Sequence, residues 1–261
     1  MELWKAAVLG IVQGLTEFLP VSSSGHIILF EKLLRVGPSG GMFFGVMLHA
    51  GTLIAVLFAY FSKIKEICKT ERKMLLYLAL ATVPAAAVGF FFGDAVDGLF
   101  FGGEYLWLFF ALTALLLLVS ERVSAKPRLL RPAGIKTSLI AGAAQAFAVI
   151  PGLSRSGTTL SACLIAGMER EKAADFSFLM SIPIIAGAIF SELLKVFSGN
   201  SPIAEISWQS LAAGTLFAAV SGFFSIKLVL KSVRSGKLYG FAVYLLILSA
   251  FLLAARVWHI V

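Results

Sequence analysis

Long apolar stretches restrict this chain to a helical membrane fold. Residues 105–119 and 241–255, extended by their flanks, approach the roughly 20 mostly apolar residues that a membrane-spanning helix needs. Of the 261 residues, 59% are hydrophobic and 14% are charged, whereas a soluble domain carries about 25% charged residues. We therefore predict an all-α polytopic membrane protein that forms a single integral membrane domain over residues 1–261.

The positive charge of the chain is concentrated in a few short connections. The formal net charge is +8, a value that in a soluble protein would raise nucleic acid as a partner. Here 16 of the 22 Lys and Arg residues fall in four segments, 63–73, 122–136, 169–172 and 227–237. Basic loops between apolar segments mark the cytoplasmic side of a membrane protein. We expect membrane lipids and no nucleic acid as partners.

The first half of the chain contains two short apolar segments and three longer ones. Residues 3–19 would form a helix of about 25 Å that stops at Pro20, which is shorter than a hydrocarbon core of roughly 30 Å. Residues 26–34 are shorter still. We predict that this pair forms a re-entrant hairpin. The three longer segments, which we expect to cross the membrane, are 42–61, 74–92 and 104–119.

The second half repeats the polar and conformationally special positions of the first at an offset of 132 residues. The stretch QGLTEFLPVSSSGH has its counterpart in QAFAVIPGLSRSGT. The positions that match are Gly10 with Gly142, Gln13 with Gln145, Ser22 with Ser154, Ser24 with Ser156, Gly25 with Gly157 and Phe44 with Phe176. We interpret the halves, about 1–125 and 133–257, as a repeat with about six transmembrane helices and two re-entrant helical hairpins.

Three crossings in each half would invert the second half relative to the first. The four basic segments then share one side, which the positive-inside rule makes cytoplasmic. Both termini are predicted to face outward, and the hairpins enter from opposite sides. Inverted repeats whose broken helices meet near the midplane are a known transporter architecture.

The two hairpin turns carry the residues of an anion site. Non-helical backbone at membrane depth is tolerated where it is buried in protein or lines a wet cavity. Ser22, Ser23 and Ser24 precede a helix, where a serine caps the first amides, and a helix N-terminus binds anions. The second turn, residues 154–158, offers the same features plus the guanidinium of Arg155, which suits bidentate binding of phosphate. The sequence thus predicts a phosphate cradle.

Glu17 and His26 add acid–base groups beside these serines. An ionisable side chain within a membrane segment indicates function, and Ser with His and Glu can form an activated hydroxyl nucleophile. Simpler interpretations stay open: a structural ion pair between Glu17 and Arg155, a His26 bonded to a backbone carbonyl, and serines that only cap helices. His49, alone on an apolar segment, is expected to be a packing residue.

Familiar motifs of other enzymes are absent from the sequence. It has no P-loop, no H-E-x-x-H and no zinc-spaced cysteine cluster. The letters SSSGH resemble the P-S-G-H element of type-2 phosphatidate phosphatases. That family also needs a further histidine shortly after S-R, and SRSGTTLSACLIAGMERE contains none.

Together, QGLTEFLPVSSSGH and PGLSRSGTT resemble the two signature regions of the undecaprenyl-pyrophosphate phosphatase family, the bacitracin-resistance proteins. The resemblance implies removal of the terminal phosphate of a C55 isoprenyl diphosphate, which recycles the lipid carrier for cell-wall synthesis. It also implies the bacterial inner membrane, a site open to the outer face, and often a divalent cation such as Mg²⁺ or Ca²⁺. Four residues fall on the catalytic positions: Glu17, Ser23, His26 and Arg155. Eight others fall on positions expected to bind substrate: Gln13, Ser22, Ser24, Gly25, Ser154, Ser156, Gly157 and Thr158.

One position departs from the pattern of many family members. Gln13 stands where they carry a glutamate, so Glu17 is the one carboxylate left as a cation ligand or as the acid–base group. A lipid-phosphate transporter or flippase that uses the same cradle is the alternative function. The sequence leaves a homodimer open.

Overall fold

The computed structural model describes residues 1–36, 41–100, 102–126, 129–198 and 206–258, and these residues contain helices but no β-strand. The prediction of an all-α polytopic membrane protein is confirmed. The helices are α1 Leu3–Phe18, α2 Ser23–Leu33, α3 Gly41–Ala59, α4 Phe61–Lys69, α5 Arg72–Phe100, α6 Leu106–Ser124, α7 Ile135–Phe147, α8 Arg155–Ile165, α9 Arg170–Phe197, α10 Trp208–Arg234 and α11 Tyr239–Val257.

Five helices among the described residues are long and apolar enough to cross a membrane: α5, α6, α9, α10 and α11. A sixth span results if α3 and α4, which are bent by 67° at their junction, count as one. The expected number of about six is therefore met. Two helix boundaries differ from those predicted from the sequence. Helix α4 occupies most of the basic segment 63–73, and α5 continues past residue 92 to Phe100.

Besides α4, four of the described helices are short, and they form two broken pairs. In the first pair α1 has 16 residues and α2 has 11, and in the second α7 has 13 and α8 has 11. Both breaks contain a proline, Pro20 or Pro151, which lacks the N–H needed to continue a helix. Corresponding helices of the two pairs begin 132 residues apart: α1 and α7 begin at Leu3 and Ile135, and α2 and α8 begin at Ser23 and Arg155.

Packing repeats at the same offset. On Gly10 of α1 a Cβ atom would overlap the carbonyl oxygen of Gly214 in α10, and on Gly142 of α7 it would overlap that of Ala81 in α5. Small residues allow this close approach of helix backbones in membrane proteins. These contacts support a repeat, while the inverted orientation of its halves stays a prediction.

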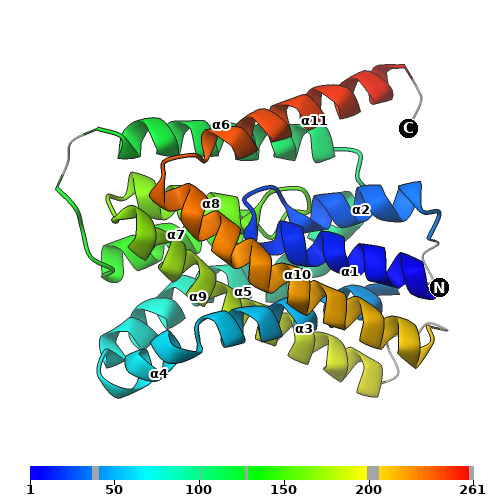
Figure 1. The fold of residues 1–261 in the computed structure, drawn as a ribbon, viewed down its shortest axis with the longest axis horizontal. Helices are drawn as coiled ribbons and strands as arrows, with labels where there is room; N and C mark the ends of the chain where they lie inside the picture. The colour runs from blue at the N-terminus through cyan, green and yellow to red at the C-terminus, as the bar shows by residue number, and fades with distance from the viewer. Residues whose placement is uncertain (37–40, 101, 127–128, 199–205, 259–261) are drawn as a thin grey trace.

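The ends of the molecule differ in charge. Figure 1 shows the start of α1 and the end of α11 at one end of the molecule, and α4 with the α10–α11 connection at the other. The four basic segments begin or end in α4, α6, α9 and α10. The turn between α1 and α2 lies between the two ends (Figure 1).

Aromatic side chains of α6 and α9 pack against the residues on either side of this turn. Phe18 is fully buried and packs edge-on against Phe178 of α9, with 5.6 Å between ring centroids. Phe110 of α6 is also fully buried, and its ring occupies the space that a side chain on Gly25 would need. The start of α2 is thereby fixed against α6.

Candidate functional site

Glu17 lies in the last turn of α1 and is buried. Residues four apart share a helix face, so Gln13 lies one turn earlier and donates from Nε2 to Glu17 Oε2 at 2.9 Å. A buried carboxylate needs hydrogen bonds or a cation to offset its lost hydration. Glu17 receives both, from residues that are far apart along the chain.

The turn after α1 returns the chain so that Ser23 meets Glu17. Ser22 has φ of 72°, in the left-handed region that costs a non-glycine residue on the order of 1 kcal/mol or more. It is the N-cap of α2, and its Oγ accepts from the amide of Gly25 at 3.3 Å. The predicted serine cap is confirmed. Ser23, the first helical residue, donates from Oγ to Glu17 Oε2 at 2.7 Å.

The second turn brings Arg155 to the same carboxylate. Ser154 is the N-cap of α8, where its Oγ accepts from the amide of Gly157 at 3.0 Å, and its own amide donates to Thr113 Oγ1 of α6 at 3.1 Å. Arg155 follows directly, and its Nη2 donates to Glu17 Oε1. The other terminal nitrogen, Nη1, is buried and has no hydrogen-bond partner among the residues that the structure describes.

Two further bonds tie the turns to each other. The amide of Gly152 donates to Ser24 Oγ at 3.2 Å, and Ser156 Oγ donates to the carbonyl of Leu19 at 3.0 Å. Gly152 has φ of 94°, a conformation that glycine adopts without steric cost. Since Ser24 and Ser156 are equivalent at the repeat offset, each half contributes one hydroxyl to the join.

We call Gln13, Glu17, Ser23 and Arg155 the Glu17 cluster. It combines a hydroxyl, a carboxylate bonded to it, and a guanidinium that retains a free nitrogen. The first amides of α2 and α8, which have no intrahelical acceptor, begin at this cluster. Gly25 and Gly157 use their amides in the caps. Buried Thr158 Oγ1 has no hydrogen-bond partner in the described part of the chain. This set of donors suits a phosphate oxyanion.

The structure does not bring His26 to Ser23 or Glu17. Its Nδ1 lies 2.7 Å from the carbonyl oxygen of Ser22, and its Nε2 lies 2.7 Å from the hydroxyl oxygen of Tyr244 in α11. The His26 and Tyr244 rings also stack, with centroids 5.8 Å apart. His26 therefore fixes the strained Ser22 and joins α2 to α11. Sequence reasoning gave no indication of Tyr244.

His49 is at the cluster rather than in apolar packing, contrary to expectation. Its Nδ1 lies 2.9 Å from Gln13 Nε2 and 3.5 Å from Glu17 Oε2. The only sequence signal was a titratable residue in an otherwise apolar segment, which does not say what the side chain contacts.

The described residues do not form a preassembled divalent-cation site. No group of three or more His, Cys, Asp or Glu side chains occurs among them with metal-binding geometry. Both oxygens of Glu17 are already engaged, and the guanidinium of Arg155 on Oε1 would repel a cation there. Gln13 turns its amide nitrogen, which is not a metal ligand, toward the carboxylate.

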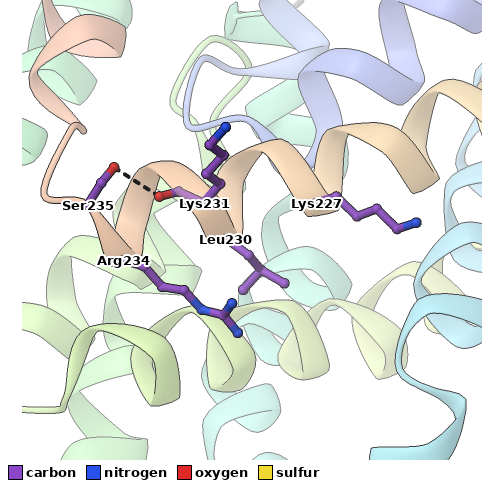
Figure 2. A pocket seen from close by; sticks show the side chains of 5 residues that line it. All are labelled: Lys227, Leu230, Lys231, Arg234 and Ser235. Carbon is purple, nitrogen blue, oxygen red and sulfur yellow. Dashed lines mark hydrogen bonds between the residues drawn. The ribbon is translucent and has the colours of Figure 1, made fainter.

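A cavity of about 500 Å³ is lined by residues near the end of α10 and by none of the Glu17 cluster. Figure 2 shows its lining residues along this helix, with the side chains of Lys227, Lys231 and Arg234 diverging. None of the residues predicted for the site lines it. It belongs to one of the four basic segments.

Comparison with known proteins gives a consistent result over nearly the whole chain. The family model described as bacitracin resistance protein BacA matches residues 6–251. An undecaprenyl-diphosphatase from Halothermothrix orenii is 40% identical over 247 residues, covering 94% of each chain. A protein of the same name from Carboxydothermus hydrogenoformans is 39% identical over 257 residues, which cover 98% of each chain. Another from Korarchaeum cryptofilum is 35% identical over 271 residues, which cover 97% of this chain and 99% of its own.

Proposed function

This chain belongs to the bacitracin resistance protein BacA family, and on that premise we propose how it works as an undecaprenyl-diphosphatase at the Glu17 cluster. One observation carries the assignment of the site: the Glu17 carboxylate is bonded at once by the Ser23 hydroxyl and the Arg155 guanidinium. The diphosphate is the substrate, and undecaprenyl phosphate and inorganic phosphate are the products.

In the first step Ser23 Oγ attacks the terminal phosphorus of the diphosphate. The bond from that phosphorus to the bridging oxygen breaks, and undecaprenyl phosphate leaves. The proton of the Ser23 hydroxyl passes to Glu17 Oε2, to which it is already hydrogen bonded. Glu17 is better placed for this than His26, whose two ring nitrogens face Ser22 and Tyr244.

In the second step water hydrolyses the phosphoserine. The oxygen of water bonds to phosphorus, the bond from phosphorus to Ser23 Oγ breaks, and Glu17 returns its proton to Ser23 Oγ. Inorganic phosphate leaves with both protons of the water. In both steps Arg155 Nη1 and the amides at the start of α2 and α8 bind the phosphate oxygens and stabilise their negative charge. Thr158 and the serines at positions 22, 24, 154 and 156 hold the two turns or contact phosphate. No step passes through a metal ion.

The location of the site fits recycling of the lipid carrier. We propose that the protein lies in the bacterial inner membrane with both termini outside and the site reached from the outer leaflet. The basic segments at one end of the fold support this orientation. The isoprenyl tail would lie between helices, where apolar side chains of the protein face lipid.

A phosphoenzyme experiment tests the mechanism. Purified protein in detergent, mixed with a short isoprenyl diphosphate labelled in the terminal phosphate and quenched in acid, should retain label that Ser23→Ala abolishes. Turnover without retained label in rapidly quenched samples would favour direct attack by water. Phosphate release in detergent also separates the enzyme from a transporter, because transport needs two compartments. The transporter alternative has no support from the matched proteins, which carry a diphosphatase name.

A further inference from the structure

His49 reaches the Glu17 cluster from α3, a helix that contributes no other residue to it. Its side chain is 37% exposed, whereas that of Glu17 is 5% exposed. Its Nδ1 lies 2.9 Å from Gln13 Nε2, a hydrogen-bond distance, and 3.5 Å from Glu17 Oε2. His49 thus contacts the amide more closely than the carboxylate.

The hydrogen-bond donors and acceptors fix the state of this group. Gln13 must turn its amide nitrogen, not its oxygen, toward Glu17, because two oxygens at 2.9 Å would repel each other. The nitrogen carries two hydrogens. One is used on Glu17 Oε2, and the other points to His49 Nδ1, which must then be an acceptor. His49 is accordingly neutral, with its proton on Nε2.

We propose that His49 is a positioning residue, which acts through Gln13. Its Nδ1 holds the Gln13 amide in the orientation that donates to Glu17 Oε2, the oxygen that also accepts the Ser23 proton. This role rests on the proposed function of the cluster. The terminal torsion of a glutamine is broad and two-fold. Without His49 the second hydrogen of the Gln13 amide loses its partner, so the amide can rotate away from Glu17 and hold the carboxylate less firmly against Ser23.

The other half of the repeat provides an internal comparison. Gln145 is equivalent to Gln13, but Ser181 occupies the position equivalent to His49, and its hydroxyl donates to the carbonyl of Phe178. Gln145 Nε2 donates to the carbonyl of Ala81 at 3.4 Å, and its Oε1 finds no partner within the described residues. In the first half, Gln13 contacts both the carboxylate of Glu17 and the imidazole of His49. In the second half, Gln145 contacts a backbone carbonyl instead.

Two substitutions that each mimic one ring nitrogen of histidine test the proposal. His49→Asn keeps an acceptor close to the position of Nδ1, whereas His49→Gln reaches the position of Nε2 and loses that acceptor. We expect His49→Asn to keep kcat within about twofold of the wild type. His49→Gln and His49→Leu should lose about tenfold in kcat with little change in KM, the size of effect expected for one neutral hydrogen bond. Size-exclusion profiles in detergent verify that the variants are folded.

Two variant backgrounds sharpen the result. In a Gln13→Leu background, His49→Leu should cost little more, because the two residues act as one unit. In a Gln145→Leu background it should cost the full tenfold. Full activity of His49→Leu would overturn the proposal, as would rescue by His49→Gln but not by His49→Asn.

One readout is independent of activity. The chain has three histidines, so nitrogen-15 labelling of histidine gives a spectrum in which the His49 signal is the one lost in His49→Asn. We expect that signal to report the tautomer protonated at Nε2. The tautomer protonated at Nδ1 would refute the proposal even if the enzyme is active. The expected tautomer in a protein without phosphatase activity would refute the function alone.

Discussion

Replacing Arg155 by lysine tests whether the guanidinium acts as a fork or only as a positive charge. Arg155 uses Nη2 on Glu17, while its Nη1 has no partner among the described residues and is the nitrogen that we propose binds phosphate. Lysine has a single nitrogen, which cannot reach both groups in the geometry of the fork. One hydrogen bond between charged groups is then lost, which costs about 2 kcal/mol, or roughly 30-fold in kcat/KM.

The chain offers a matched control for this change. Arg170 also binds a carboxylate through Nη2, that of Glu121 at 2.7 Å, and its Nη1 is likewise buried without a partner. It lies at the start of α9, outside the cluster. In a phosphate-release assay with a short isoprenyl diphosphate, Arg155→Lys should lose roughly 30-fold and Arg170→Lys less than threefold. If both variants remain within threefold of the wild type, Arg155 is a structural counter-charge and our reasoning fails.

Three further changes probe the nucleophile, the cation and the orientation. Ser23→Ala should abolish phosphate release yet leave binding of the diphosphate largely intact in equilibrium binding measurements. Ser22→Ala, which removes a cap worth about 1 kcal/mol, should keep measurable turnover. Turnover by Ser23→Ala together with an inactive Ser22→Ala would show that the wrong serine was chosen. Gln13→Glu, which places a second carboxylate one turn from Glu17, should make phosphate release respond to added Mg²⁺, and a rate of this variant that neither Mg²⁺ nor EDTA changes would refute this expectation. Cys68, which is exposed at the end of α4, should react in spheroplasts only with membrane-permeant maleimides, and labelling by an impermeant reagent would reverse the orientation.

Local signals in the sequence predicted most of the fold. Apolar stretches located the spanning helices, and the prolines at positions 20 and 151 located the breaks, because each effect acts within a few neighbouring residues. Helix α4 was not anticipated, because its residues read as a basic loop. Its nine residues are too few for a stable isolated helix, so its helicity depends on packing against α3 and α5.

The site was predictable where its residues adjoin the two turns. Glu17, Ser23 and Arg155 lie within or next to the repeated motifs, and the serine caps follow from residue type and position. His49 and Tyr244 could not be found in this way. Their contacts with Gln13 and His26 span 36 and 218 residues along the chain, and only the packing of α3 and α11 against the turns brings them there.

At the repeat offset of 132 residues, the position equivalent to Ser23 is Arg155, and the position equivalent to Glu17 is Val149. Neither half can therefore perform the chemistry by pairing with a copy of itself. Two first halves would oppose two buried carboxylates with no cation between them, and two second halves would oppose two guanidiniums with no nucleophile. The active centre needs residues of both halves, so the difference between the halves is essential. We expect residues 1–126 and 129–261, produced as separate chains in one membrane, to supply together the parts of a single active centre, and each fragment alone to be inactive.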